Sequence, residues 1–301
     1  MKVCCYGSRF HGGQIDRIEQ GFVALGHELT PHSHEASIIF SNDPAAFDQI
    51  VIDRCGGKIH GKVIFNVQDI PLHLGAAFDC AKLKSQLVKA DAVTTISEYV
   101  QWQVREYLGL DSHVIYQPTK AVWKKPSYEM FIRKRFAHIG RRFDGNKNFN
   151  LGVAALQLLG YHHYDMFLVG NETGWGDYCG VLSDDNLNRV YNSVDFVLTL
   201  GTVEGLSLPT LEAMACGAIP VVHNRMTTRR ELLPPDLFPE YNSVDAEPAS
   251  VARFISRYTS DPAAMAEMKE RLHTHYQTNW AHKLTGRAVA ERIVEVARSL
   301  S

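Results

Sequence analysis

Short apolar runs that alternate with amphipathic stretches restrict the possible folds of this chain more than any other feature of its sequence. The runs are rich in β-branched residues. This alternation is typical of βαβ units, in which helices join parallel strands. We therefore predict an α/β protein with two Rossmann-like halves. Strands are expected at Lys2–Tyr6, His27–Thr30, Ser37–Phe40, Val63–Val67, Ala92–Ile96 and His113–Tyr116 in the first half, and at Phe136–Ile139, Asp165–Val169, Phe196–Thr199 and Ile219–Val222 in the second.

A change of character separates the two halves. Between the last expected strand of the first half and the first strand of the second, the chain is polar and interrupted by prolines, as linkers commonly are. We predict one domain over residues 1–119 and another over residues 120–279. Apolar residues recur at helical spacing in Leu284–Leu300. We expect residues 280–301 to form a helix that crosses back and joins the first domain.

The composition and the charge of the chain exclude several protein classes. The 301 residues are 45% hydrophobic and 21% charged, which rules out a disordered chain, a collagen or a coiled coil. The 31 Lys and Arg residues against 33 Asp and Glu residues give a net charge of -2, so no global field attracts nucleic acid or anionic lipid. A local basic run fits either a solvated linker face or a surface that follows a phosphate backbone: Arg105, Lys120, Lys124, Lys125, Arg133, Lys134 and Arg135.

No segment of the sequence has the pattern of a membrane anchor. The longest weakly charged stretch, Gly205–Val222, is interrupted by a carboxylate and by prolines, whereas a spanning helix needs about 20 consecutive apolar residues. The first residues, Met1–Gly7, turn polar before an apolar signal region forms. We expect a cytoplasmic protein without an integral membrane segment, and a peripheral association with a membrane stays open.

The cysteines and histidines do not form the pattern of a metal site. The cysteines include no CxxC pair, and we expect them to be reduced. The histidine clusters lack Cys or carboxylate partners at the spacing of a zinc site. We expect the last cluster, His273 and His275, to be solvated on a polar helix. No metal and no bound cofactor is predicted.

The segment from Glu204 to Val222 is the most informative part of the sequence. After an expected strand, the loop Gly205–Leu208 leads into a helix whose first turn accommodates Pro209. Gly217 is expected to end this helix in the left-handed conformation. A glycine-containing loop at a helix N-terminus presents unpaired N–H groups and the positive end of the helix dipole. These features suit a phosphate or sugar hydroxyls.

Two carboxylates accompany this loop. Glu204 lies just before it, and Glu212 is expected in the first turn of the helix, so both can face the carboxyl ends of the strands. Carboxylates accept hydrogen bonds from diols, and a sugar and a ribose both offer diols beside a phosphate. The alternative is that Glu204 is a solvated loop charge and Glu212 an acid that stabilises the helix.

Both carboxylates lie in the segment EGLSLPTLEAMACGAIPVV, which resembles the hallmark of the retaining glycosyltransferases of family 4. The resemblance implies the GT-B fold, with two Rossmann-like domains whose parallel sheets face a central cleft. It implies that the first domain lies on the acceptor side and that the second binds a nucleotide-sugar donor. In the family's pattern, Glu204 contacts the transferred sugar and Glu212 the ribose. The loop residues that would also hold the donor are Gly205, Leu206, Ser207 and Leu208.

A second segment, from Phe136 to Asn148, supports the resemblance. It is expected to run from a strand through a basic loop into a helix, and arginine and lysine side chains on one loop suit a diphosphate. The family's similar element places one arginine and one lysine on the diphosphate of the donor. By resemblance these are Arg141 and Lys147, with Arg142 as the rival of Arg141. A solvated basic turn is the alternative.

Weaker signals lie in three other places. Gly12 and Gly13 follow the first expected strand and resemble the family's glycine pair, which lets the backbone approach the donor. Asp69 follows another expected strand, where the family often has His-Asp beside the reacting sugar. Asp69 is a candidate for contacting the donor sugar or an acceptor hydroxyl, or it caps a turn. Gly170 and Asn171 end a strand in the region that holds the nucleotide base in the family.

The resemblance implies an enzyme that moves a sugar from a UDP- or GDP-sugar to an acceptor hydroxyl with retention of configuration. The catalytic candidates are Glu204, Arg141, Lys147 and Asp69. Positive groups would stabilise the departing diphosphate, so no metal is required. The acceptor can be a glycan, a lipid, a small molecule or a modified nucleic acid. Two alternatives stay open: a sugar-nucleotide epimerase or hydrolase on the same fold, and a non-catalytic nucleotide-binding Rossmann protein.

Overall fold

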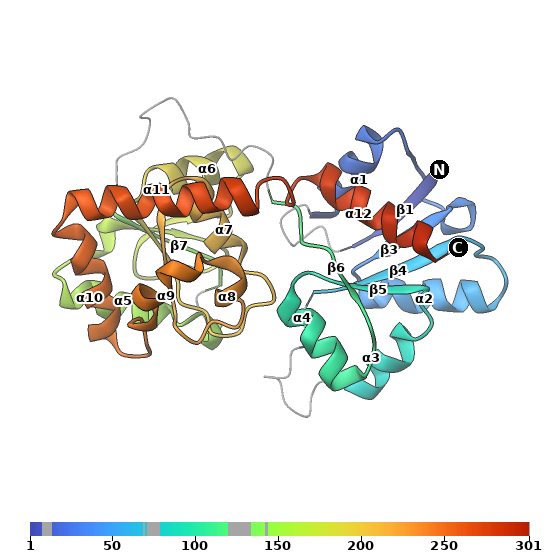
Figure 1. The fold of residues 1–301 in the computed structure, drawn as a ribbon, viewed down its shortest axis with the longest axis horizontal. Coiled ribbons are helices and arrows are strands. Elements are labelled where there is room, and N and C mark those ends of the chain that lie inside the picture. Colours follow the sequence, from blue (N-terminus) through green and yellow to red (C-terminus); the bar gives the residue numbers. More distant parts are fainter. Residues whose placement is uncertain (8–13, 69, 71–78, 120–133, 142–143, 301) are drawn as a thin grey trace. The chain divides into compact units, whose positions relative to one another are not determined.

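The structure is a computed structural model that describes residues 1–7, 14–68, 70, 79–119, 134–141 and 144–300. The chain divides into two compact units, each of which contains one sheet (Figure 1). The first unit consists of Met1–Thr119 and His282–Ser301, and the second consists of Lys120–Ala281. The two ends of the chain therefore belong to the same unit.

A parallel sheet forms the centre of the first unit. In spatial order its strands are β2 (Glu28–Leu29), β1 (Lys2–Tyr6), β3 (Ile38–Ser41), β4 (Lys62–Val67), β5 (Ala92–Thr95) and β6 (His113–Val114). All neighbouring pairs are parallel, as the alternation of strands and helices predicts. Every residue of β3 and β5 is buried, because helices cover both faces of a parallel sheet.

Helices connect the strands of the first unit. Some begin at a residue whose side chain satisfies a free N–H group of the first turn. Ser97 accepts a hydrogen bond of 3.1 Å from the N–H of Val100, and Thr285 accepts one of 3.1 Å from Ala288. The elements are α1 (Gln14–Ala24), the 3-10 turn η1 (Ser33–Glu35), α2 (Pro44–Cys55), α3 (Cys80–Leu87), α4 (Glu98–Gln103), the π-helix η3 (Val104–Leu108) and α12 (Gly286–Ser299).

Helix α12 completes the core of the first unit. Figure 1 shows α12 beside α1, and the two helices pack against each other. Ile293 of α12 and Phe22 of α1 are fully buried in one cluster with residues of the sheet. Gly21 in α1 and Gly286 in α12 permit this contact, because a Cβ atom at either position would lie 2.1 Å from a backbone oxygen of the other helix.

A second parallel sheet forms the centre of the second unit. In spatial order its strands are β11 (Ile219–Val222), β10 (Phe196–Thr199), β7 (Phe136–Ile139), β8 (Met166–Val169) and β9 (Asp177–Gly180). All neighbouring pairs are parallel. The first four strands lie where the sequence predicts them. The edge strand β9 is not among the predictions, because its residues are polar or half-exposed and give no apolar run.

Helix α7 (Leu208–Ala215) follows β10 and has Pro209 in its first turn. Gly217 ends it with a φ of +72°, in the expected left-handed conformation. The expected position of Glu212 is wrong: it lies in the second turn, because the helix begins at Leu208, one residue earlier than expected. The other helices of this unit are α5 (Phe149–Leu158), η5 (His163–Asp165), α6 (Asp184–Asn192), α8 (Arg229–Leu232), η6 (Pro235–Leu237), α9 (Phe238–Asn242), α10 (Pro248–Thr259) and α11 (Pro262–Asn279).

Two expectations about surface residues are wrong. His273 and His275 on α11 are not simply solvated, because their ring nitrogens lie 3.3 and 3.0 Å from backbone carbonyl oxygens of the second unit. Lys134, in the basic run, is buried and pairs with Asp177. It therefore belongs to neither a solvated face nor a phosphate-binding surface. The members of the run that lie outside the described residues are Lys120, Lys124, Lys125 and Arg133.

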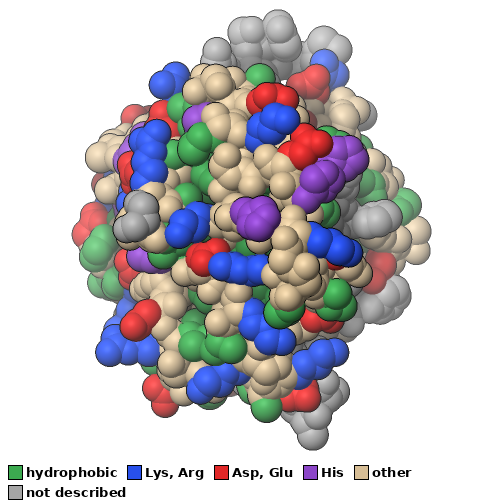
Figure 2. Space-filling model, turned by 90° about the vertical axis from the view of Figure 1, so that its right-hand side faces the viewer, with side chains coloured by type: hydrophobic (Ala, Val, Ile, Leu, Met, Phe, Trp, Pro, Cys, Tyr) green, Lys and Arg blue, Asp and Glu red, His purple; other side chains and the backbone are tan. Residues whose placement is uncertain are grey.

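The charged side chains on the face drawn in Figure 2 are of mixed sign. Basic, acidic and histidine side chains are interspersed there, in agreement with the net charge of -2. None of the helices in the described part of the chain is long and apolar enough to cross a membrane.

The strand order of the second sheet reverses at β7. The next strand in the sequence, β8, lies on one side of β7, whereas the later strand β10 lies on the other side. Open α/β sheets bind ligands at the carboxyl ends of the strands beside such a reversal. The register of β7 with β10 ends after Ala137 and Val197, whereas β7 and β8 pair over their full length. A ligand site is therefore expected at the loops that follow β7 and β10.

Candidate functional site

The loops that follow β7 and β10 are joined by an ion pair. Lys147 ends the short 3-10 helix η4 (Gly145–Lys147), and its Nζ lies 2.6 Å from Oε1 of Glu204. The side chain of Glu204 is 12% exposed, and that of Lys147 is 26% exposed. Glu204 is therefore not a solvated loop charge. A lysine and a glutamate that lie far apart in the sequence thus meet beside the carboxyl ends of the strands.

The backbone around Glu204 is fixed by the loop that follows β11. The N–H of Glu204 donates to Oγ1 of Thr227, and the Thr227 hydroxyl donates to the carbonyl oxygen of Glu204, both at 2.9 Å. Gly201 leaves room for the carboxylate, because a Cβ atom at this position would lie 2.1 Å from Oε1 of Glu204. Neither Thr227 nor Gly201 is among the residues that the sequence singles out.

Two asparagines hold the Lys147 loop against the Glu204 loop. Oδ1 of Asn146 accepts hydrogen bonds from the hydroxyl of Thr202 at 2.9 Å and from the N–H of Val203 at 2.8 Å, and its Nδ2 donates to the carbonyl of Val203. Nδ2 of Asn148 donates to a backbone carbonyl just after β10 at 2.9 Å. Asn148 has a φ of +50°, a conformation that asparagine tolerates better than most residues. These contacts hold the backbone on both sides of Lys147 in place.

His138 lies on β7, the strand that the Lys147 loop follows. Its ring is buried, and it packs edge-on against Phe149 with the ring centroids 4.9 Å apart. Burial is the main cause that lowers the pKa of His138 to about 4, and the charge of Lys147 acts in the same direction. His138 is therefore neutral at pH 7. Within the described residues, its Nε2 has no hydrogen-bond partner.

The N-terminus of α7 follows Glu204 after a short loop, Gly205–Ser207. Among the described residues, no hydrogen bond engages the N–H groups of Gly205 and Leu206. The Ser207 and Thr210 hydroxyls lie 2.9 Å apart and close the first turn. Free N–H groups and the positive end of a helix dipole favour an anion at this position.

Glu212 projects from the second turn of α7 and has a different partner from Glu204. It is 6% exposed, and its Oε2 accepts a hydrogen bond of 2.7 Å from the hydroxyl of Tyr191, a fully buried residue of α6. The two carboxylates singled out in the sequence are thus each held by a separate polar partner, one in a loop and one in a helix.

Two glycines approach each other at the ends of β7 and β8. Gly140 has a φ of +134° and Gly170 a φ of +152°, and a Cβ atom at position 170 would lie 2.4 Å from the carbonyl oxygen of Gly140. Arg141 follows, with a side chain that is 72% exposed and a guanidinium nitrogen 3.3 Å from Oδ2 of Asp144. Asn171 is exposed. Arg141 thus lies just after the end of β7, and within the described residues no hydrogen bond or ion pair joins it to Lys147 or Glu204.

Four of the predicted site residues lie outside the described part of the chain: Gly12, Gly13, Asp69 and Arg142. Their roles stay predictions. Among the described residues, no group of three or more His, Cys, Asp or Glu side chains is arranged to hold a metal ion. The expectation that no metal is needed also stays a prediction.

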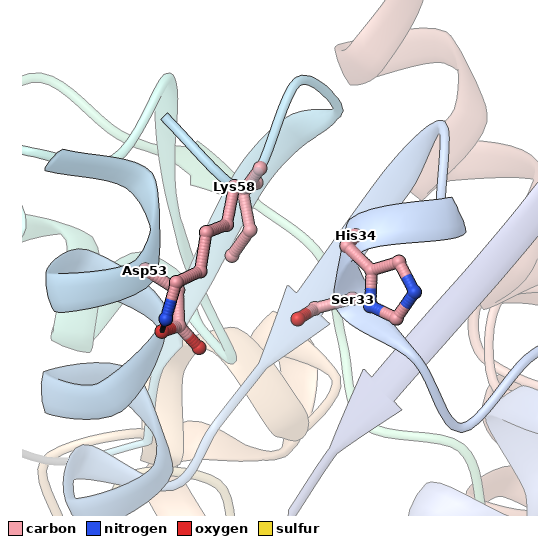
Figure 3. A pocket seen from close by; sticks show the side chains of 5 residues that line it. Ser33, His34, Asp53 and Lys58 are labelled. Atoms are coloured by element: carbon pink, nitrogen blue, oxygen red, sulfur yellow. Dashed lines mark hydrogen bonds and ion pairs between the residues drawn. The ribbon is translucent and has the colours of Figure 1, made fainter. Parts of the chain in front are cut away.

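A separate pocket lies in the first unit, and none of the residues that line it is a predicted site residue. Figure 3 shows its position between η1 and the turn that follows α2. Ser33, His34, Asp53, Lys58 and Ile59 line it, and the charges of Lys58 and Asp53 neutralise each other at 3.5 Å. It lies near the amino ends of β3 and β4, the opposite edge from that at which open α/β sheets bind ligands.

Comparison with known families and sequences finds a glycosyltransferase-like segment that lies mostly in the second unit and ends in the first. Residues 151–290 match the family model described as Glycosyl transferase-like. This segment contains Glu204 and Glu212 but begins after Lys147. A stretch of 83 residues is 35% identical to O-antigen chain mannosyltransferase B of Escherichia coli, and it covers 27% of this chain and 22% of that protein. The similarity to this relative is thus local.

Solved structures match the chain over nearly its whole length. Sucrose-phosphate synthase of Thermosynechococcus elongatus has a TM-score of 0.77 at 15% identity, with 100% of this chain and 99% of that chain covered. HepE of Anabaena, solved in complex with UDP and glucose, has a TM-score of 0.73 at 16% identity, with 99% and 100% covered. These likenesses confirm the predicted GT-B class of fold.

Proposed function

We propose that this chain is a glycosyltransferase that moves a sugar from a UDP- or GDP-sugar to an acceptor hydroxyl, with retention of configuration and without a metal. The observation that carries the proposal is the pairing of Lys147 with Glu204 in the loops that follow β7 and β10, a few residues before the N-terminus of α7. A cation, a carboxylate and free N–H groups at a strand-order reversal suit a ligand that combines a diphosphate with a diol.

In the proposed reaction, the bond from the sugar's anomeric carbon to the diphosphate breaks as the acceptor oxygen bonds to the same face of that carbon. The leaving phosphate oxygen takes the acceptor's proton. Lys147, Arg141 and the N-terminus of α7 stabilise the charge that builds on the diphosphate, which is the usual task of a metal ion. Glu204 accepts hydrogen bonds from the sugar, and Glu212 accepts them from the ribose.

The comparisons support the donor class and one acceptor class. HepE of Anabaena, which has the same fold, was solved with UDP and glucose, which favours a sugar nucleotide as the ligand. The local similarity to O-antigen chain mannosyltransferase B favours a glycan among the acceptors that the sequence leaves open.

A transfer assay tests the reaction. The chain is incubated in EDTA with UDP- and GDP-sugars and a panel of glycan acceptors, and NMR reads the anomeric configuration of the product. We expect acceptor-dependent release of one nucleoside diphosphate and a product with the configuration of the donor. Consumption of the donor without any acceptor would instead identify an epimerase or a hydrolase. Binding without consumption would identify a nucleotide-binding protein.

Variants of the basic groups test the donor site. Lys147→Met and Arg141→Ala should each weaken the binding of the nucleoside diphosphate by about 1.5–3 kcal/mol, the contribution of a hydrogen bond to a charged group. Arg271→Ala is the matched control, because Arg271 belongs to the same unit and pairs with Asp236 at 2.6 Å. Unchanged affinity in both test variants would place the diphosphate elsewhere.

A further inference from the structure

Polar contacts join helices α6 and α7. The Tyr191 hydroxyl donates to Oε2 of Glu212 at 2.7 Å, and the thiol of Cys216 lies 3.4 Å from Oδ1 of Asn188. Asn188 and Tyr191 lie three positions apart and therefore on one face of α6. Glu212 and the cap residue Cys216 lie four positions apart on one face of α7, so the two faces contact each other. The position of Glu212 is therefore set by α6 as well as by its own helix.

The contact between Tyr191 and Glu212 is shielded from water. Tyr191 is 0% exposed and Glu212 is 6% exposed. Burial is the main cause that raises the pKa of Tyr191 well above its ordinary value, and the charge of Glu212 adds to it. The phenol thus stays protonated and donates its hydrogen to the carboxylate. A charge-assisted hydrogen bond in a low-dielectric setting holds a side chain more firmly than one in water.

We propose that Tyr191 is a positioning residue that orients the carboxylate of Glu212 for the ribose of the donor, and that it thereby sets the preference for ribonucleotides over 2′-deoxyribonucleotides. The inference rests on the proposed function. Tyr191 itself touches Glu212 and not the donor. With Oε2 held by the phenol, the carboxylate cannot turn about its own axis, so its acceptor positions keep one direction. The rigid, fully packed ring gives this orientation a low entropic cost.

The variant Tyr191→Phe removes the hydroxyl and keeps the ring. If wild type binds UDP, we expect the Kd for UDP to rise about tenfold in the variant, while the Kd for 2′-deoxy-UDP changes little; GDP and 2′-deoxy-GDP replace them if the base is guanine. The ratio of the two affinities should fall toward one. In turnover, KM for the donor should rise with kcat within about twofold, because the reacting sugar is not touched. Glu212→Gln should remove the same preference, and the double variant should add nothing further.

Tyr241→Phe is the matched control. Tyr241 is also 0% exposed, lies in the same unit, and donates its hydroxyl hydrogen to the carbonyl of Pro220 at 2.9 Å. The two Tyr→Phe variants should lose similar thermal stability, but Tyr241→Phe should keep the preference for ribose. An unchanged preference in Tyr191→Phe, or an equal change in both variants, would overturn the inference.

A second measurement needs no variant. With ring-labelled tyrosine, the 13C signal of Tyr191 Cζ should move when wild type binds the ribonucleotide and move less with the 2′-deoxy analogue. An identical response to both would also overturn the inference. If wild type binds neither UDP nor GDP, the proposed function fails and the inference fails with it. If wild type prefers the ribonucleotide and Tyr191→Phe does too, the inference alone fails.

Discussion

The carboxylate of Glu204 fills the space that a side chain at position 201 would occupy. Its Oε1 lies 2.6 Å from Nζ of Lys147 and would lie 2.1 Å from a Cβ atom on Gly201. The backbone has no left-handed φ at Gly201. A glycine is therefore needed there to leave space for the carboxylate of Glu204. In the proposed donor complex, Lys147 would bind the diphosphate and Glu204 would bind the sugar, instead of binding each other.

The variant Gly201→Ala tests this packing. The added methyl group should displace the carboxylate of Glu204 from Lys147, so we expect the affinity for the donor sugar and the turnover to fall toward the values of Glu204→Gln. The measurement is a pair of Kd values, one for the nucleoside diphosphate and one for its sugar conjugate. Gly145→Ala is the control, since within the described residues no atom beyond its chain neighbours lies within 4 Å of a Cβ atom there. Full turnover in Gly201→Ala would show that Glu204 needs no fixed position.

His138 gives the molecule a stability that depends on pH. Its native pKa of about 4 lies below the ordinary value of 6.5, so between these values the unfolded chain binds a proton that the native chain does not. Stability is therefore lost as the pH falls from 6.5 to 4, by at most about a tenfold change in the unfolding constant per pH unit. Denaturant titrations across this window should show a flatter dependence for His138→Phe. An identical slope in both proteins would contradict the assigned pKa.

At the residue scale, the sequence identifies the charged groups and misses what holds them. Glu204 and Lys147 stand out because they belong to a recognisable pattern of acid, base and glycine loop. Asn146 and Thr227 belong to no recognisable sequence pattern, although they hold the two loops in place. Their role depends on three loops that meet in space, and no local pattern shows which loops meet.

Among the elements, α1 and α12 make the closest helix contact that the glycines reveal. The backbone oxygen of Gly286 occupies the place that a Cβ atom on Gly21 would take, at 2.1 Å. The nearest atoms belong to the backbone of α12, so no side chain can move aside to make room for a methyl group. The contact lets the last helix of the chain lie directly on the first one.

The variant Gly21→Ala tests the element packing. Alanine improves helix propensity by up to about 1 kcal/mol, but overpacking against a backbone costs about 1–3 kcal/mol, so we expect net destabilisation in a chemical unfolding experiment. Gly56→Ala, where a Cβ atom would meet its nearest neighbour at 3.5 Å, should leave the free energy of unfolding nearly unchanged. A Gly21→Ala variant more stable than wild type would show that the helices can separate at little cost.

At the element scale, strands with apolar runs were predictable and irregular pieces were not. The strands of the second sheet other than β9 follow their runs closely, because a buried parallel strand needs apolar residues on both faces. The edge strand β9 and the π-helix η3 have no such run. The start of α7 was misplaced for a related reason: Pro209 fits more than one position of a first turn, so it does not fix whether Glu212 lies in the first turn or the second.

On the scale of the whole molecule, the two ends of the chain build one unit. The core of the first unit combines residues of the sheet and of α1 with residues of α12. The variant Ile293→Ala should lower the stability of this unit by about 2–5 kcal/mol, the usual cost of truncating a buried Ile. Leu272→Ala, which truncates a fully buried residue of α11, is the counterpart in the second unit.

Amide hydrogen exchange locates these losses. Ile293→Ala should accelerate exchange in β1 and β3, although these strands lie far from position 293 in the sequence. Leu272→Ala should accelerate exchange around α7 and α11. Faster exchange in Ile293→Ala at α7 and α11 but not at β1 and β3 would contradict the assignment of α12 to the first unit's core.

The central claim is that Lys147 and Glu204 mark the place where a sugar nucleotide binds. Calorimetric titration of wild type, Lys147→Met and Glu204→Gln in EDTA with UDP, GDP and their sugar conjugates tests it most directly. We expect wild type to bind one of the two nucleotides and to bind its sugar conjugate more tightly. Lys147→Met should weaken both ligands, whereas Glu204→Gln should weaken the conjugate more than the nucleotide. If wild type binds neither UDP nor GDP, or if all three proteins have equal affinities, Lys147 and Glu204 do not form a sugar-nucleotide site.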